Sequence, residues 1–357
     1  MSVKQFYALF MLASFSPLIR LTSAAGARLA GRAGWVSVFI SCAVLYGLIA
    51  LFSLYFRRAD KADLYSLYKT AFGKAAANVL AMLYAVWVFI LAGYYLGMFS
   101  ERFAGGIMPG VSAEFFTITL LALVFIILSG EFRSFALLGN ISFYMVLTSI
   151  AVIFLLQLPK IRPENLLPVT TYDAEGILMG SLPMLGVFAY LTPLLFISGT
   201  LPSFKKHGLY CALTLLAVNI VIVMSTIGVF GADLTKEMRQ PFLMSVKTMG
   251  AQGALERLES VFLLLWVVTD LAIIVMFLHV LLKLTGTLTG VQKPAIFRAP
   301  LILGVYVLSG FLIRDMSGTA AFTERIGLPV NLIMGFGLPG LAVMVGVVRL
   351  KAKKKSG

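Results

Sequence analysis

The sequence predicts an all-α integral membrane protein of about ten transmembrane helices, arranged as a five-plus-five inverted repeat with broken helices one and six. Hydrophobic residues make up 60% of the chain and charged residues only 12%, whereas a soluble domain is about half apolar and a quarter charged. Apolar runs of about 18 or more residues, long enough to cross a bilayer, recur from end to end. Two runs, the first and the sixth, carry proline, small residues and hydroxyls at mid-membrane depth.

Each apolar run has the length of one membrane-spanning helix. The expected spans are 5–25, 34–57, 77–100, 114–130, 134–158, 177–200, 208–231, 258–284, 298–314 and 328–350. We expect one transmembrane domain over 1–357, with repeats at about 5–158 and 177–350 and a basic tail at 351–357, because no loop exceeds about 25 residues. Residues 1–26 have features of a signal peptide, but Arg20 falls late in the apolar run, so we retain them as the first span.

The breaks in the first and sixth spans indicate a ligand site. The first, over 13–26, includes Ser16, Pro17 and Thr22; the second, over 183–193, includes Gly186, Ala189, Tyr190 and Thr192. An unwound segment persists only where it is packed in protein or lines a wet cavity. The N–H groups of a following half-helix suit a carboxylate, and exposed carbonyls suit an ammonium group or a cation. Paired breaks therefore favour a zwitterionic amino acid; the alternative is two proline kinks relieved by neighbouring helices.

Two charged residues lie inside spans, where charge is costly and indicates function. They are Arg20 in the first span and Asp270, about 12 residues and roughly 18 Å into the eighth. An Arg20–Asp270 pair would neutralise both, either as a ligand-sensitive ion pair beside the site or as a fixed structural contact. Alternatively, Arg20 extends toward the outer interface. Both residues are included among the candidate ligand-binding residues.

The basic residues favour cytoplasmic N- and C-termini. That orientation places the larger share of Lys and Arg inside, including the clusters 57–74 and 349–355, which could also hold anionic membrane lipids. Apolar residues at helical spacing predict a surface helix within 60–76. A short amphipathic helix is expected within 233–257, with Pro241 as a breaker; it caps the bundle or, alternatively, gates an extracellular ligand path.

Several classes of function are disfavoured. The net charge of +14 is explained by membrane topology, so no nucleic-acid partner is expected. No catalytic, phosphate-binding or metal motif is visible, so we expect no enzyme activity, no cofactor and no metal. Cys42 and Cys211 fall inside spans and are expected to be buried small hydrophobes. His279, in the eighth span, is expected to bond to another helix, with a proton relay as the alternative.

The stretch 255–270, Leu-Glu-Arg-Leu-Glu-Ser-Val-Phe-Leu-Leu-Leu-Trp-Val-Val-Thr-Asp, resembles the eighth-span signature of spore germinant receptor B subunits, also called spore permeases. Pro-Phe-Leu at 241–243, Pro-Glu-Asn-Leu-Leu-Pro at 163–168, the chain length, the ten spans and the basic tail are similar to that family too. The resemblance implies the inverted repeat of the amino acid–polyamine–organocation transporter superfamily.

The resemblance also implies a function. Such subunits sense nutrients in the spore inner membrane, in a complex with A-type and C-type subunits, and ligand binding triggers germination. We therefore expect a germinant-receptor membrane subunit that binds a small amino-acid-like nutrient; a secondary active amino-acid transporter and a structural membrane partner with a vestigial site are the alternatives. The chain departs from the family at Ser16-Pro17, at 188–192 (Phe-Ala-Tyr-Leu-Thr instead of Phe-Pro-Phe-Gly-Glu) and at Arg20, which indicates a different ligand.

Overall fold

The computed structural model describes residues 1–357 except 60–62, 109, 200, 251–255, 313–321 and 356–357. The described residues form helices joined by short loops, without a β-strand. Nine helices in this part of the chain are long and apolar enough to cross a membrane, and Ala113–Ser129 is a shorter apolar helix. The prediction of an all-α integral membrane protein with about ten helices is confirmed, while the inverted repeat stays a prediction.

Each expected span corresponds to a helix or to a series of helical segments. The helices are α1 Val3–Ala30, α2 Ser37–Phe56, α3 Leu64–Phe72, α4 Lys74–Arg102, α5 Ala113–Ser129, α6 Phe132–Gln157, α7 Ala174–Phe188, α8 Leu191–Leu194, α9 Phe204–Phe230, α10 Ala232–Glu237, α11 Pro241–Gly250, α12 Glu256–Thr289, α13 Arg298–Leu312, α15 Leu328–Leu332 and α16 Leu338–Lys355. The tenth span is interrupted by a π-helical segment, Ile333–Gly337, between α15 and α16. A second π-helical segment, Thr323–Gly327, precedes α15.

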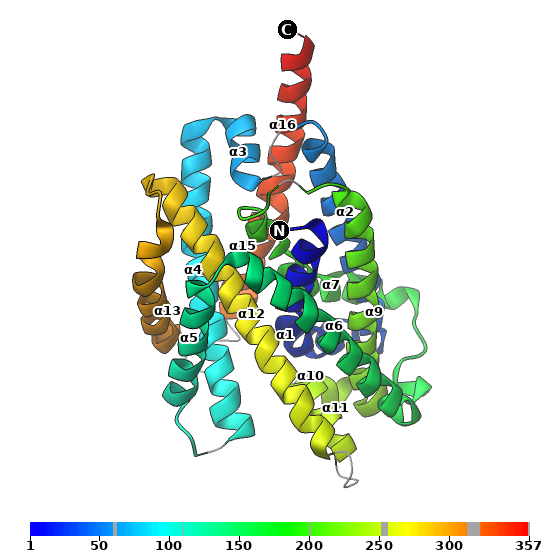
Figure 1. Cartoon of the computed structure of the whole chain (residues 1–357). Helices are drawn as coiled ribbons and strands as arrows, with labels where there is room; N and C mark the ends of the chain where they lie inside the picture. The colour runs from blue at the N-terminus through cyan, green and yellow to red at the C-terminus, as the bar shows by residue number, and fades with distance from the viewer. Residues whose placement is uncertain (60–62, 109, 200, 251–255, 313–321, 356–357) are drawn as a thin grey trace.

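The first and sixth spans lie in the interior of the bundle. α1 packs against α6, α7, α9 and α12 (Figure 1). In the most apolar stretch of the first span 83% of the residues are buried, and in that of the sixth 78%, against 11% for the stretch that contains α13. α13 therefore lies at the periphery, and polar groups on α1 and α7 are shielded from lipid by other helices.

The first span is not broken, so that prediction is wrong. α1 runs without interruption for 28 residues, with Pro17 inside it. Pro17 has no N–H to offer the carbonyl of Ala13, but a helix packed on several sides tolerates one missing hydrogen bond as a local distortion. For the first span the alternative interpretation therefore holds: Pro17 lies within a helix, and neighbouring helices relieve its effect.

The sixth span is broken as predicted. α7 ends at Phe188, and α8 begins at Leu191 after two intervening residues. Pro193 explains the position of the break, because it has no N–H to bond the carbonyl of Ala189 four residues earlier. The Ala189 carbonyl accepts from the N–H of Thr192 instead, at 3.1 Å, which tightens the turn.

Short helices cover both ends of the bundle. α3 forms where a surface helix was predicted: Asp63 caps its N-terminus by accepting from the Ser66 N–H at 2.8 Å, and its apolar residues Leu64, Leu67 and Tyr68 are buried. α3 packs against α4 and α16. At the opposite end, α10 and α11 pack against α1, with the helix boundary before Pro241 as expected (Figure 1). Residues 251–255 of that expected helix lie outside the described part.

Candidate functional site

The break in the sixth span is packed directly against the tenth. The Thr192 hydroxyl donates to the carbonyl of Gly335 at 2.7 Å, and the Tyr84 hydroxyl donates to the neighbouring carbonyl of Met334. Both carbonyls lie in the π-helical segment 333–337, so the side chains give partners to backbone groups of a widened turn. Thr192 therefore holds two helices together, and its hydroxyl is already bonded within the protein.

Gly335 allows this close approach. A Cβ atom at Gly335 would collide with both the Cα and the Cβ of Ala189. Gly186, one turn earlier on α7, is similarly close to the tenth span, since a Cβ there would lie 2.8 Å from Leu328 Cδ1. The predicted site residues Gly186 and Ala189 thus provide small surfaces at which the sixth and tenth spans meet.

Tyr190 connects the break to α4. Its hydroxyl is hydrogen-bonded to the Tyr95 hydroxyl at 2.7 Å and accepts from Asn331 Nδ2 at 3.4 Å. Asn331 is held in turn by the Trp87 indole N–H, which donates to Asn331 Oδ1 at 2.9 Å. All four side chains are buried, so they form a continuous polar chain through an apolar interior.

Arg20 lies beside this chain. Its guanidinium carbon is 5.3 Å from the ring centroid of Tyr94 and 5.7 Å from that of Tyr95. The residue is only 7% exposed, and its Nη2 has no hydrogen-bond partner among the described residues. Cation–π contact with two tyrosines partly replaces the lost hydration. It does not replace a carboxylate.

Asp270 does not pair with Arg20, so that expectation is wrong. Asp270 Oδ2 accepts from Nη1 of Arg102 at 2.6 Å, and the Ser16 hydroxyl donates to Oδ1. The Trp266 indole N–H donates to Ser16 Oγ at 2.9 Å, and the Arg102 guanidinium carbon lies 4.4 Å from the Trp266 ring centroid. Arg102, Trp266, Ser16 and Asp270 therefore form one buried cluster that joins α1, α4 and α12.

Sequence reasoning missed Arg102, because it follows Ser100-Glu101, just beyond the end of the expected span 77–100. α4 in fact continues to Arg102, which brings the guanidinium back into the interior. The signal available in the sequence was the unpaired acid in the eighth span. A buried carboxylate needs a cation, and Arg20 was not the sole arginine near the ends of the spans.

The remaining polar groups of the first span bond within the protein. Ser14 and Thr22 donate to carbonyls one turn earlier on α1, those of Phe10 at 2.8 Å and Leu18 at 2.7 Å. Pro17 is buried within the same helix. These residues shape α1 and leave Ser16 as the hydroxyl in this span that reaches the Asp270 cluster.

The buried charges around α1 do not balance. Arg20 and Arg102 are two cations within electrostatic range of each other, and Asp270 is the carboxylate paired with one of them. Glu101 is half-buried and lies within range of Arg20, but it also faces Arg239, and no ion pair joins it to Arg20 among the described residues. The site therefore carries an excess positive charge in an interior where charge is weakly screened.

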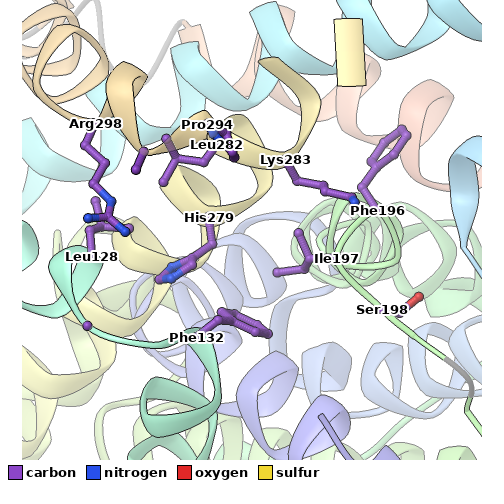
Figure 2. Close-up of a pocket in the computed structure, with 12 residues that line it drawn as sticks. Leu128, Phe132, Phe196, Ile197, Ser198, His279, Leu282, Lys283, Pro294 and Arg298 are labelled. Atoms are coloured by element: carbon purple, nitrogen blue, oxygen red, sulfur yellow. The ribbon is translucent and has the colours of Figure 1, made fainter. Parts of the chain in front are cut away.

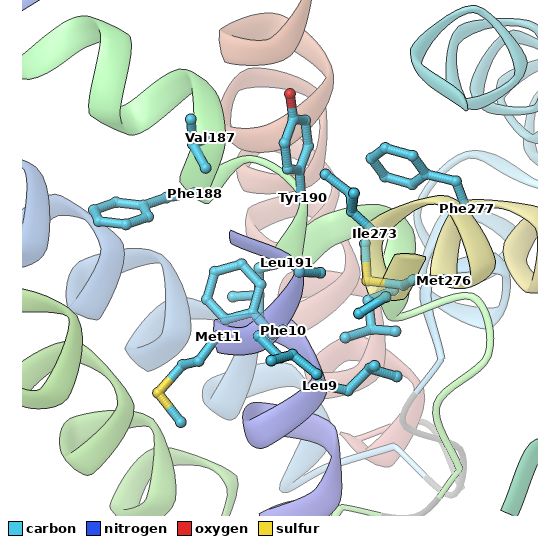
Figure 3. Close-up of a cluster of buried hydrophobic side chains, with 14 of the residues drawn as sticks. Leu9, Phe10, Met11, Val187, Phe188, Tyr190, Leu191, Ile273, Met276 and Phe277 are labelled. Atoms are coloured by element: carbon cyan, nitrogen blue, oxygen red, sulfur yellow. The ribbon is translucent and has the colours of Figure 1, made fainter. Parts of the chain in front are cut away.

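Apolar side chains enclose the region between the broken sixth span and its neighbours. Figure 3 shows these side chains coming from four elements. They are Leu9, Phe10 and Met11 of α1, Val187 and Phe188 of α7, Leu191 of α8, and Ile273, Met276 and Phe277 of α12, with Tyr190 among them. Such walls exclude water and strengthen electrostatic interactions at the polar groups they surround.

Two other expected features have clear outcomes. Cys42 and Cys211 are buried free thiols, as predicted. His279 bonds within its own helix, with Nδ1 2.9 Å from the Val275 carbonyl, so the expected bond to another helix is wrong; its ring stacks on Phe135 of α6. No group of three His, Cys, Asp or Glu residues suited to a metal ion occurs in the described ranges.

Comparison with known proteins agrees with this architecture. A family model described as spore germination protein matches residues 2–314. Spore germination protein KB of Bacillus subtilis (strain 168) is 21% identical over 379 residues, covering 99% of this chain and 96% of that protein. The match and the apolar helices together establish a multi-pass membrane protein of a receptor- or transporter-like family rather than an enzyme family. The chain belongs to the spore germination protein (spore permease) family.

Proposed function

We propose that this protein is the membrane subunit of a nutrient germinant receptor, and that it senses a small amino-acid-like ligand and triggers spore germination. Membership of a family of membrane germination proteins supports a role in spore germination at a membrane. The broken sixth span beside the charged cluster of α1, α4 and α12 supports the ligand site. The observation that carries the proposal is the buried guanidinium of Arg20, which forms no ion pair among the described residues and whose Nη2 has no hydrogen-bond partner there.

A ligand carboxylate is the group that Arg20 lacks. A buried ion that stays unpaired costs several kcal/mol of desolvation free energy, which bound solvent or a counter-ion must offset. Arginine binds carboxylates through parallel N–H donors, which gives both strength and orientation. Tyr94 and Tyr95 hold the guanidinium in place before the ligand arrives. A carboxylate bound there would neutralise the excess positive charge.

The ligand's ammonium group requires an acceptor nearby. Asp270 uses one lone pair on each oxygen for Arg102 and Ser16, and a carboxylate offers about four such sites. We assign the ammonium group to Asp270, while Tyr190 lines the site at the break in the sixth span. Ser16, Pro17 and Thr22 then shape the α1 wall of the site, and Gly186, Ala189 and Thr192 shape the sixth-span wall.

We further propose the location and partners of the subunit. The protein resides in the spore inner membrane with both termini in the cytoplasm, which places the basic clusters at 57–74 and 349–355 inside. α3 and the C-terminal end of α16 lie together at that end of the bundle. A-type and C-type germinant receptor subunits complete the assembly.

Ligand-induced thermal stabilisation tests the proposal. The purified full-length protein in lipid nanodiscs would be heated with single amino acids, one at a time. A ligand at 100 times its Kd should add about 2.7 kcal/mol of stability and raise Tm. The Arg20→Gln variant should lose the shift. Arg28→Gln, which removes an exposed arginine of the same helix, should keep it.

Two results would count against this function. An absence of any shift across the amino acids, together with normal germination of spores that carry Arg20→Gln, would remove the ligand site. Sustained counterflow of a labelled amino acid in proteoliposomes would instead assign the protein as a carrier.

A further inference from the structure

A pocket of about 440 Å³ opens at the end of the bundle that carries α3. It lies between the end of α5, the start of α6, residues 196–198 after α8, the C-terminal part of α12 and the start of α13 (Figure 2), and its lining includes no residue of the Asp270 cluster. Its walls include Leu128, Phe132, Phe196 and Leu282, and its basic residues are Lys283 and Arg298. This pocket has no role in the proposed nutrient site.

The charge in the pocket is entirely of one sign. Arg298 of α13 lies at one side of the pocket, Lys283 of α12 points toward Phe196 at the other, and His279 of α12 lies between them; the lining contains no Asp or Glu (Figure 2). Arg298 is half-buried, and its Nε is buried without a hydrogen-bond partner among the described residues. Lys283 forms no ion pair in the same part of the chain. Glu131 is close in sequence, but it is exposed and does not line the pocket. An anion is therefore the missing partner.

The surroundings favour an anion that also carries a hydrocarbon chain. The flanking helical segments present apolar side chains outward: Ile126 of α5 is 66% exposed, Leu303 of α13 is 63% exposed, and Ile296, beside the pocket, is 70% exposed. In a membrane-spanning bundle such residues face lipid. Lys283 is six residues before the end of α12, roughly 9 Å along the axis, which is the depth of a headgroup region.

We propose that this pocket binds one anionic phospholipid. Its phosphodiester is held by Arg298, Lys283 adds to the positive potential, and an acyl chain lies along Leu128, Phe132 and Leu282. The lipid supplies an acceptor for the unpaired Arg298 Nε and fills a volume that opens toward the bilayer. This inference does not depend on the nutrient site and holds whether the protein is a sensor or a carrier.

Native mass spectrometry of the full chain, with phosphatidylglycerol or phosphatidylcholine added at matched concentration, tests the proposal. Phosphatidylglycerol should form a discrete one-to-one adduct, and phosphatidylcholine should bind more weakly. Lys283→Gln and Arg298→Gln should each weaken the adduct roughly fivefold. Arg133→Gln, which removes an exposed arginine at the start of α6 outside the lining, should leave it unchanged. Arg298→Lys, which keeps the charge, should retain binding if Arg298→Gln misfolds.

A second measurement distinguishes lipid from a soluble anion. Thermal stabilisation of the delipidated protein should appear with phosphatidylglycerol and not with inorganic phosphate or glycerol phosphate at the same concentration. Equal protection by the soluble phosphates would overturn the assignment to a lipid. Equal affinity for phosphatidylcholine, or unchanged affinity in Lys283→Gln and Arg298→Gln, would overturn the anion site itself.

Discussion

Arg102 of α4 and Asp270 of α12 form an ion pair of 2.6 Å in the interior of the bundle, with side chains only 3% and 1% exposed. The pair joins two helices that are far apart in sequence, and Ser16 of α1 completes it by donating to the same carboxylate. Three helices therefore depend on one carboxylate for the arrangement of their polar groups.

Removing one member of this pair should destabilise the protein more than removing both. Asp270→Asn leaves Arg102 buried and unpaired, and we expect a loss of about 3–5 kcal/mol. The double variant Arg102→Gln, Asp270→Asn should recover a substantial part of the stability lost in Asp270→Asn. Denaturation in detergent, read as a double-mutant cycle, measures the coupling. Lys236→Gln, which breaks the exposed pair with Asp233, serves as the control and should change little.

Arg20→Gln should make the ligand-free protein more stable. It removes a buried charge that forms no ion pair among the described residues, so we expect a gain of roughly 1–2 kcal/mol. The same variant should lose the nutrient-induced rise in Tm. Arg20→Lys keeps a charge but not the planar donors, and should gain no stability. A destabilised Arg20→Gln protein would mean that Arg20 already has a partner.

Gly335→Ala should disrupt the contact between the sixth and tenth spans. The added methyl collides with Ala189, and overpacking of this kind costs about 1–3 kcal/mol. Gly337→Ala is the matched control, because a Cβ there meets its nearest atom, the Leu332 carbonyl oxygen, at 3.9 Å. Thermal unfolding of the two variants side by side gives the comparison. Equal Tm values would show that the junction has room to adjust.

Pro193→Ala should partly repair the broken sixth span. Alanine supplies an N–H four residues after Ala189, so the Ala189 carbonyl, which now accepts from Thr192, can form a regular α-helical bond; one such bond adds about 1 kcal/mol of local stability. Hydrogen exchange of the amides between 189 and 195 should slow roughly fivefold as a result. Pro17→Ala should have a smaller effect on exchange in its own neighbourhood, because α1 is already continuous. Similar slowing of hydrogen exchange around residue 193 in Pro193→Ala and around residue 17 in Pro17→Ala would contradict the finding that the sixth span is broken and the first is continuous.

The parts of the fold that could be predicted from the sequence are those that hydrophobicity determines directly. The ten spans and the amphipathic α3 were predictable, because apolar length and helical spacing are direct consequences of burial in lipid or against the bundle. The continuity of α1 at Pro17 was not, because proline weakens a helix by an amount that packing can offset. The sequence around Pro193 is no more distinctive than that around Pro17. Among the described residues of the first and sixth spans, however, only the sixth span is broken.

The pairing of buried charges was the hardest to predict. Arg20 and Asp270 were correctly placed inside the membrane domain, and electroneutrality suggested that they pair. The continuation of α4 to Arg102 instead brings that residue to Asp270, and Arg20 lies beside two tyrosines. Which of two arginines meets an acid depends on helix packing across more than 160 residues of sequence, and no local pattern specifies it.

The junction of Ala189 and Thr192 with Gly335 also has a mechanical consequence. Only the Ala189 methyl lies between the two backbones, and a hydroxyl is bonded across them, so the α7–α8 connection cannot slide past the tenth span without carrying it along. α16 continues from this point to the end of the described chain, packed on α2 and α3. A movement at the break would thus be carried along α16 to the end of the bundle where it packs on α3.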